Sequence, residues 1–186
     1  PPSHGFFKEV DHLCIDVNEF LHQSEKKLGS LQSLRRKAFR QIQKIMTILP
    51  PKKSLVLAFD GPAPYAKLQR QRETRLQETG LLKSMLTPGT ALMGSMEEFF
   101  TIQIAKQIGK MRDVTVFMSD SSKPGEGEIK LLNWVKSYVP RNSGDSVVLC
   151  GCDADILLQA VGRTVASNST LVFQRSQKDR NAALFN

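Results

Sequence analysis

The sequence predicts an α/β protein, with a three-layer α/β/α arrangement around a mostly parallel central sheet. Two observations predict this class. Short apolar runs rich in β-branched residues recur along the chain, and amphipathic helical patterns lie between them. With 186 residues, of which 40% are hydrophobic, the chain is long enough to form one domain with a substantial core.

The apolar runs give the expected strands. They lie at 12–17, 54–59, 114–118, 146–150 and 170–174. The first expected helix, over 31–49, carries its apolar face on Leu31, Leu34, Ala38, Ile42, Ile45, Met46 and Leu49. The second, over 95–111, uses Phe99, Ile102, Ala105 and Ile108. The third follows the sequence PGEGE at 124–128 and uses Ile129, Leu132, Trp134 and Val135, and a short fourth helix follows Asp153.

The composition favours a polyanionic partner, nucleic acid first. Lys and Arg number 26 and Asp and Glu 18, which gives a net charge of +8, although many proteins are basic without binding nucleic acid. No apolar run is long enough to cross a membrane, so we expect no membrane segment. Cys14, Cys150 and Cys152 lie in apolar runs and are expected to be reduced core residues of an intracellular protein.

Carboxylates follow the carboxyl ends of the expected strands. Six of them are candidates for one site: Asp16, Asp60, Glu126, Glu128, Asp153 and Asp155. Ligands of open parallel sheets bind at that edge, and clustered hard oxygen donors suit Mg²⁺ or Mn²⁺. Taken singly, each acid also fits a turn, an N-cap or the first turn of a helix. Asp120, which also follows a strand, is better explained as a turn or cap residue than as a ligand.

Two groups of basic residues are candidates for binding phosphate. Lys67, Gln71 and Arg75 are spaced i, i+4 and i+8, so on a helix they share one face that suits a terminal phosphate. An exposed basic helix is the alternative. The helix around Arg35, Arg36, Lys37 and Arg40 could follow a phosphate backbone, and a merely solvated face is the alternative there.

Five segments carry a resemblance to a known family. IDVNEFLH, FDGPAPYAKLQRQRETR, LTPGT, PGEGEIKLLNWV and CDADILLQAVG resemble, in order, the motifs of the XRN family N-terminal nuclease domain over residues 6 to 162. That family comprises 5′-to-3′ exoribonucleases and is related more distantly to flap endonucleases and PIN-like nucleases. The resemblance implies a PIN/FEN-like nuclease fold and a single XRN N-terminal-like nuclease domain over residues 1–186.

The resemblance also implies roles for individual residues. The family's metal carboxylates match the six acids Asp16, Asp60, Glu126, Glu128, Asp153 and Asp155, which would hold two Mg²⁺ or Mn²⁺ ions. Its 5′-phosphate pocket matches Lys67, Gln71 and Arg75. His22 matches a histidine that stacks on the first base, and Asn18 matches an asparagine that orients the site. The implied activity is metal-dependent hydrolysis of 5′-monophosphorylated single-stranded RNA from the 5′ end.

Departures from the family pattern leave alternatives open. Thr74 stands where the family has a pocket arginine, no GNDF-like segment follows, and the family's large C-terminal half is absent. The chain, which begins at Pro1, is expected to be either a fragment of a longer protein or a reduced relative. It is either an exoribonuclease, a weakened RNA-binding or assembly subunit of a larger RNA–protein complex, or a flap or PIN-type endonuclease. Its expected compartment is the cytoplasm or nucleus, with the mitochondrion as an alternative.

Overall fold

The computed structural model describes residues 10–25, 30–62, 86–109, 111, 113–140, 143–151, 170–175 and 182–185. The predicted helix after Asp153 lies outside these ranges. In the part of the chain that the structure describes, no helix is long and apolar enough to cross a membrane.

A six-stranded sheet forms the centre of the fold. In chain order the strands are β1 (Val10–Asp16), β2 (Pro51–Ala58), β3 (Thr115–Ser119), β4 (Val147–Cys150), β5 (Thr170–Arg175) and β6 (Ala182–Phe185). Their spatial order is β3-β2-β1-β4-β5-β6. All neighbouring pairs are parallel except β5 and β6, which are antiparallel. The mostly parallel sheet is therefore confirmed, and β6 is an edge strand that the sequence pattern did not predict.

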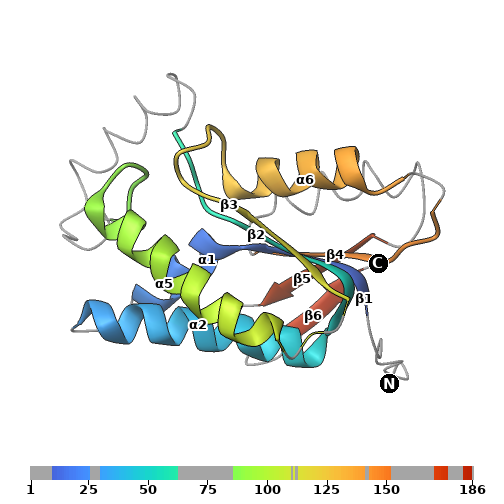
Figure 1. Ribbon diagram of the computed structural model, residues 1–186, viewed down its shortest axis with the longest axis horizontal. Coiled ribbons are helices and arrows are strands. Elements are labelled where there is room, and N and C mark those ends of the chain that lie inside the picture. Colours follow the sequence, from blue (N-terminus) through green and yellow to red (C-terminus); the bar gives the residue numbers. More distant parts are fainter. Residues whose placement is uncertain are drawn as a thin grey trace.

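Helices cover both faces of this sheet (Figure 1). Helices α1 (Val17–Glu25), α2 (Leu31–Ile48) and α5 (Ala91–Ile108) lie on one face, and α6 (Gly127–Tyr138) lies on the other. The first three belong to the connections β1–β2 and β2–β3, whereas α6 belongs to the return from β3 to β4. Parallel connections are right-handed, so reversing the direction of travel across the sheet moves the helix to the opposite face. The predicted three-layer arrangement is confirmed.

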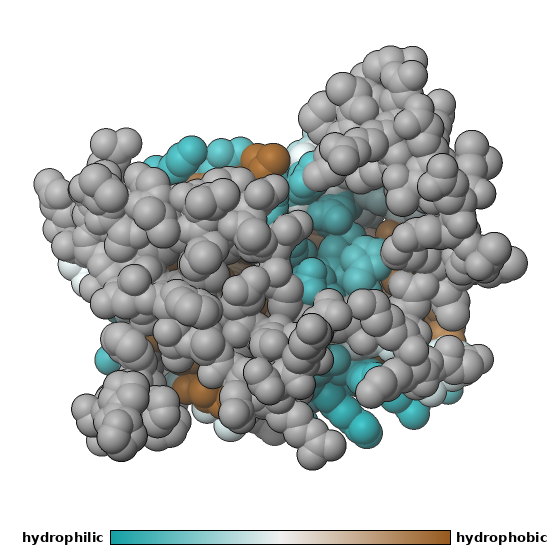
Figure 2. Space-filling model, turned by 180° about the vertical axis from the view of Figure 1, so that it is seen from behind, coloured by the Kyte–Doolittle hydropathy of each residue, from teal (hydrophilic) through white to brown (hydrophobic). Residues whose placement is uncertain are grey.

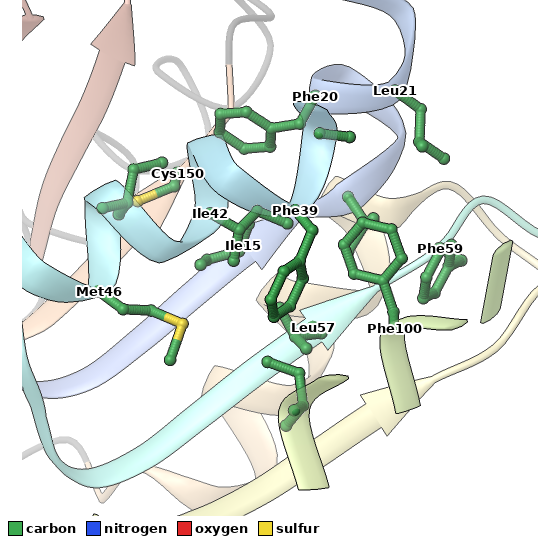
Figure 3. Close-up of a cluster of buried hydrophobic side chains, with 14 of the residues drawn as sticks. Ile15, Phe20, Leu21, Phe39, Ile42, Met46, Leu57, Phe59, Phe100 and Cys150 are labelled. Carbon is green, nitrogen blue, oxygen red and sulfur yellow. The ribbon is translucent and has the colours of Figure 1, made fainter. Parts of the chain in front are cut away.

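The larger core lies between the sheet and the three helices on one face (Figure 3). Phe100 of α5 is at its centre, and its ring packs edge-to-face on Phe39 of α2 and on Phe59 just after β2, with ring centroids 5.5 and 5.7 Å apart. A smaller core lies under α6, where Leu131 and Val135 meet the opposite face of the sheet. These two cores fix the direction of the strands and of α6.

The helical faces are only partly as predicted. On α2 the predicted residues are buried except Leu31, which is exposed. On α5 the prediction is wrong, because Ile102 and Ile108 are exposed while Met93, Met96, Phe100 and Ile104 are buried. The apolar residues of α5 itself are distributed around nearly its whole circumference, so their spacing could not show which face of the helix is buried. On α6, Ile129 is exposed, whereas Leu132 and Val135 are buried as predicted.

Ionic contacts join the chain near the amino-terminal ends of β1, β2 and β4. Lys53 Nζ lies 2.6 Å from Asp145 Oδ1, and the other oxygen of Asp145 lies 3.1 Å from His12 Nε2. The hydrogen bond from Lys53 holds the pKa of the Asp145 carboxyl below its usual value. This cluster is at the end of the sheet opposite the predicted site.

Candidate active site

The candidate site lies at the carboxyl ends of the central strands. Asp16 is the last residue of β1, and Asp60 follows the end of β2 by two residues. β1 pairs with β2 on one side and with β4 on the other, so the connections diverge at this point. Ligands of doubly wound α/β proteins bind in the crevice that such a divergence leaves open.

Asn18 links the two aspartates. Its backbone N–H donates to Asp16 Oδ1 over 3.0 Å, and its side-chain Oδ1 accepts from the backbone N–H of Asp60 over 3.2 Å. Asn18 is only 3% exposed, so neither bond is replaced readily by water. This geometry suits the orienting role that the resemblance implies for Asn18.

The sequence PGEGE brings the start of α6 against both aspartates. The backbone N–H of Gly127 donates to Asp60 Oδ1 over 2.7 Å. A Cβ added to Gly127 would lie only 2.7 Å from Asp16 Oδ1, closer than real Cβ atoms approach other atoms. Gly125 has a φ of 106°, a conformation that favours glycine. The glycines therefore let a helix N-terminus, with its partial positive charge, approach two carboxylates.

The two glutamates of PGEGE flank that contact. Glu126 is the N-cap residue of α6 and makes no side-chain capping bond, and Glu128 lies in the first turn and is 7% exposed. These positions also fit the alternative in which both glutamates serve only as acids at a helix N-terminus. Both glutamates lie next to Gly127, which contacts the aspartates.

A backbone contact fixes the PGEGE segment to the loop after β2. Gly61 N donates to Gly125 O over 2.8 Å, and Gly125 N donates to Pro62 O over 3.1 Å. A Cβ on Gly61 would overlap the carbonyl oxygen of Lys123 and lie 2.8 Å from its carbon. The sequence pattern indicated only that the preceding residue, Asp60, could be a turn residue. The structure shows that residue 61 must be glycine for the two loops to meet.

Lys130 is a second residue that the sequence analysis missed. Its ammonium donates to the carbonyl oxygens of Phe59, over 2.7 Å, and Asp120, over 2.8 Å, and so joins the ends of β2 and β3. Burial lowers the pKa of Lys130, against the attraction of Asp60 and other nearby carboxylates. The available signal was its place one helical turn after Glu126.

Asp120 is a turn residue, as predicted. Its Oδ1 accepts hydrogen bonds from the backbone N–H and the hydroxyl of Ser122, two residues later. The hydrogen bond from the Ser122 side chain contributes most to lowering the pKa of Asp120. Asp120 thus lies directly after a strand, but its carboxylate already has partners within its own turn.

The carboxyl group of Asp16 has a strongly shifted pKa. Burial raises the pKa of its carboxyl well above the usual value, and the carboxylates of Asp60 and Glu19 raise it further. Hydrogen bonds from the backbone of Glu19 and Asn18 oppose this effect only in part. A cation close to Asp16 and Asp60 would stabilise the ionised form of both carboxylates.

The donor set fits a hard divalent cation. Asp16 and Asp60 offer carboxylate oxygens beside a glycine backbone, and Mg²⁺ and Mn²⁺ prefer oxygen ligands. Among the described residues, however, no three Asp, Glu, His or Cys side chains are close enough together to hold a metal ion. Asp153 and Asp155 lie outside the described residues. The convergence of all six carboxylates therefore stays a prediction.

The candidate RNA-binding residues are only partly within the described structure. Lys67, Gln71 and Arg75 lie outside it. His22 lies on α1 four residues after Asn18, so both residues share one face of that helix. His22 is partly exposed. Its predicted stacking role stays a prediction.

Comparison with curated proteins shows distant relatives. The chain is 28% identical over 202 residues to a 5′-3′ exoribonuclease 2 of Cryptococcus neoformans, covering 85% of this chain and 18% of that protein. It is 28% identical over 185 residues to 5′-3′ exoribonuclease 1 of Saccharomyces cerevisiae, covering 81% and 12%. The chain thus spans less than a quarter of the length of these relatives.

The fold is similar to a solved nuclease structure. The catalytic core of Rad2 in complex with a DNA substrate matches 95% of this chain and 46% of that one, with a TM-score of 0.57 and 16% identity. This likeness establishes the FEN-like fold. The family described as XRN 5′-3′ exonuclease N-terminus matches the sequence at residues 3–85 and 77–172. Since these two matches include most of the sequence, the chain belongs to the XRN 5′-3′ exonuclease N-terminal family.

Proposed function

We propose that this chain is the nuclease domain of a divalent-metal-dependent 5′-to-3′ exoribonuclease that removes nucleotides from 5′-monophosphorylated single-stranded RNA. One observation carries the proposal. Asp16 is a partly exposed carboxylate whose pKa is raised beside Asp60, and the start of α6 approaches both through Gly127, which has no side chain. Family membership supplies the reaction class.

The proposed metal ligands are Asp16, Asp60, Glu126, Glu128, Asp153 and Asp155. When bound there, two Mg²⁺ ions supply activation of the attacking water and stabilisation of the leaving 3′-oxygen. The protein supplies positioning. Asn18 holds Asp16 and Asp60 in register through its two hydrogen bonds, and Gly127 N–H fixes the Asp60 carboxylate.

The proposed substrate contacts lie around these acids. Lys67, Gln71 and Arg75 bind the 5′-phosphate, and binding at that point sets one nucleotide as the product of each cleavage. His22 stacks on the first base. Recognition of a free 5′-phosphate separates this activity from that of an endonuclease, which needs no RNA end.

The experiment is degradation of labelled RNA carrying a 5′-monophosphate, 5′-hydroxyl or 5′-triphosphate, in Mg²⁺, in Mn²⁺ and in chelator. We expect metal-dependent loss of the monophosphorylated RNA alone. Asp16→Asn should abolish it, whereas Asp120→Asn should not, because Asp120 also follows a strand but its carboxylate accepts hydrogen bonds from Ser122 in its own turn. Lys67→Gln with Arg75→Gln should remove the preference for a 5′-monophosphate.

A second candidate is a non-catalytic RNA-binding or assembly subunit. It is favoured by Thr74, which stands where the family pattern has a pocket arginine, a change that would weaken binding of the 5′-phosphate. Absence of cleavage in either metal, with RNA binding retained, would establish this alternative. Cleavage of a circular RNA would instead establish an endonuclease.

A further inference from the structure

The outer face of α2 carries a row of three cations, Arg36, Arg40 and Lys44. They are spaced i, i+4 and i+8, which places them on one face of the helix, and all three are exposed. We call them the α2 cation row. α2 contains no Asp or Glu, and none of the three forms an ion pair with a residue that the structure describes.

The structure separates this row from the other basic residues of α2. The Arg35 guanidinium lies over the Phe99 ring of α5, 4.9 Å from its centroid, and Arg35 is partly buried. Lys37 is also partly buried. Arg35 therefore contributes to the packing of α2 on α5, a role that the sequence pattern did not distinguish from a surface charge.

The row costs the helix stability. Like charges four residues apart destabilise a helix by about 0.2–0.5 kcal/mol for each pair, and the row contains two such pairs. α2 is held instead by its buried opposite face and by Ser30, whose side chain caps Ser33 N. The row is therefore explained better by a polyanion that it meets than by a contribution to folding.

The direction and the length of the α2 cation row suit a nucleic-acid strand that extends away from the candidate site. In Figure 1, α2 begins at the end of the sheet where β1 gives way to α1, and it runs toward the opposite end. In Figure 2, which shows the molecule from behind, hydrophilic residues are exposed at part of its lower edge. Eight residues of helix span about 12 Å. Stacked nucleotides rise about 3.4 Å each, so the row matches three to four phosphates.

We propose that the α2 cation row binds the phosphodiester backbone of single-stranded RNA, on the 3′ side of the segment held in the candidate site. The assignment of the 3′ side rests on the proposed function, in which the 5′ end of the RNA occupies the candidate site at the carboxyl ends of the strands. The row reads no bases, since exposed cations contact phosphates irrespective of sequence. It would hold the body of the RNA while its 5′ end is in the site.

The test is equilibrium binding in chelator, which needs no cleavage and so can succeed or fail independently of the nuclease proposal. The probes are a long single-stranded RNA and a trinucleotide, each with the 5′-monophosphate that the proposed site binds. The variant is Arg36→Gln with Arg40→Gln and Lys44→Gln. For the long RNA, the slope of log K against log salt should fall by about 2, and affinity should fall roughly 100-fold near 0.1 M salt, because each phosphate contact contributes about 0.7 to the slope.

The trinucleotide should bind the variant and the wild type equally, because it is too short to leave the site and reach the row. The matched control is Lys52→Gln with Lys106→Gln and Lys136→Gln, which removes the same charge from exposed residues of β2, α5 and α6. It should change the slope far less. The row variant should also unfold at the same or a slightly higher urea concentration than wild type, which shows that the residues do not support the fold.

Other outcomes would overturn the proposal. An unchanged salt slope for the long RNA would leave the row for another partner, such as an acidic protein. An equal loss in the control variant would show an effect of net charge alone. An equal loss for the trinucleotide would place the cations within the site itself.

Discussion

Replacing Gly61 by alanine tests whether the contact between the two loops builds the candidate site. The added Cβ would overlap the carbonyl oxygen of Lys123, a backbone atom that cannot move aside as a side chain would. The loop carrying Gly61 must therefore separate from the PGEGE segment. That movement breaks the bonds from Gly61 N to Gly125 O and from Gly125 N to Pro62 O.

The cost follows from these contacts. Forcing an extra carbon into a packed position costs about 1–3 kcal/mol. Two lost backbone hydrogen bonds add about 0.5–1.5 kcal/mol each. We expect Gly61→Ala to lower the free energy of unfolding by about 2–6 kcal/mol, a large share of the roughly 5–15 kcal/mol of a typical domain.

The assay is urea unfolding followed by the fluorescence of Trp134, the single tryptophan, which packs against Phe117 and His12. Gly94→Ala is the matched control. Gly94 lies in α5, and nothing lies within 4 Å of an added Cβ, so alanine there should stabilise the protein by about 0.5–1 kcal/mol. A Gly61→Ala variant within about 0.5 kcal/mol of wild type would refute the reasoning.

Four further predictions follow from the same structure. Gly127→Ala should lower the free energy of unfolding by about 1–3 kcal/mol in urea titrations, because the added Cβ would press on Asp16. It should also reduce the rise in melting temperature caused by Mg²⁺, and an unaltered Mg²⁺ response would contradict this. Asp16→Asn should raise the free energy of unfolding of the metal-free protein near neutral pH. A carboxyl whose pKa is raised on folding stabilises the protein at pH values below its pKa in the unfolded chain, and this stability is lost as pH rises through the folded pKa. The advantage of Asp16→Asn should vanish in acid, and an advantage independent of pH would exclude a charge effect. The pKa of Asp145 is lowered, chiefly by Lys53. The carboxylate therefore stabilises the protein at pH values above its pKa in the unfolded chain, about 3.9, and this stability is lost as pH falls through the folded pKa. Asp145→Asn should therefore destabilise the protein near neutral pH but little near pH 2, as measured by urea midpoints; equal losses at both would contradict it. Lys130→Met should cost about 2–4 kcal/mol in thermal or urea unfolding, because two carbonyl oxygens lose a charged donor; a stable variant would show that water replaces the ammonium.

Much of the fold could be predicted from local pattern. The runs that became β1 to β5 are short and β-branched, and such runs in alternation with helices leave few topologies open. The prediction failed where the pattern was ambiguous. α5 has apolar residues on nearly every side, so its sequence could not show that Phe100 would be fully buried, in contact with the rings of Phe39 and Phe59. The edge strand β6 comes from a weakly patterned tail.

Some features of the candidate site could likewise be predicted from the sequence, and others could not. Asp16 and Asp60 could be placed at one edge because parallel strands end together. Local sequence could not show that Gly61 meets the backbone of Lys123, or that the Lys130 ammonium joins two strand ends.

The sequence by itself determined the fold class, the family and the kinds of donor in the site, because these depend on residue type, order and period. Only the tertiary structure decided which atoms meet. Asn18 bridges Asp16 and Asp60, and Arg35 packs on Phe99 while Arg36 stays at the surface. Such contacts join residues distant in the chain or distinguish neighbours of the same charge. They depend on the packing of whole elements, which no local pattern encodes.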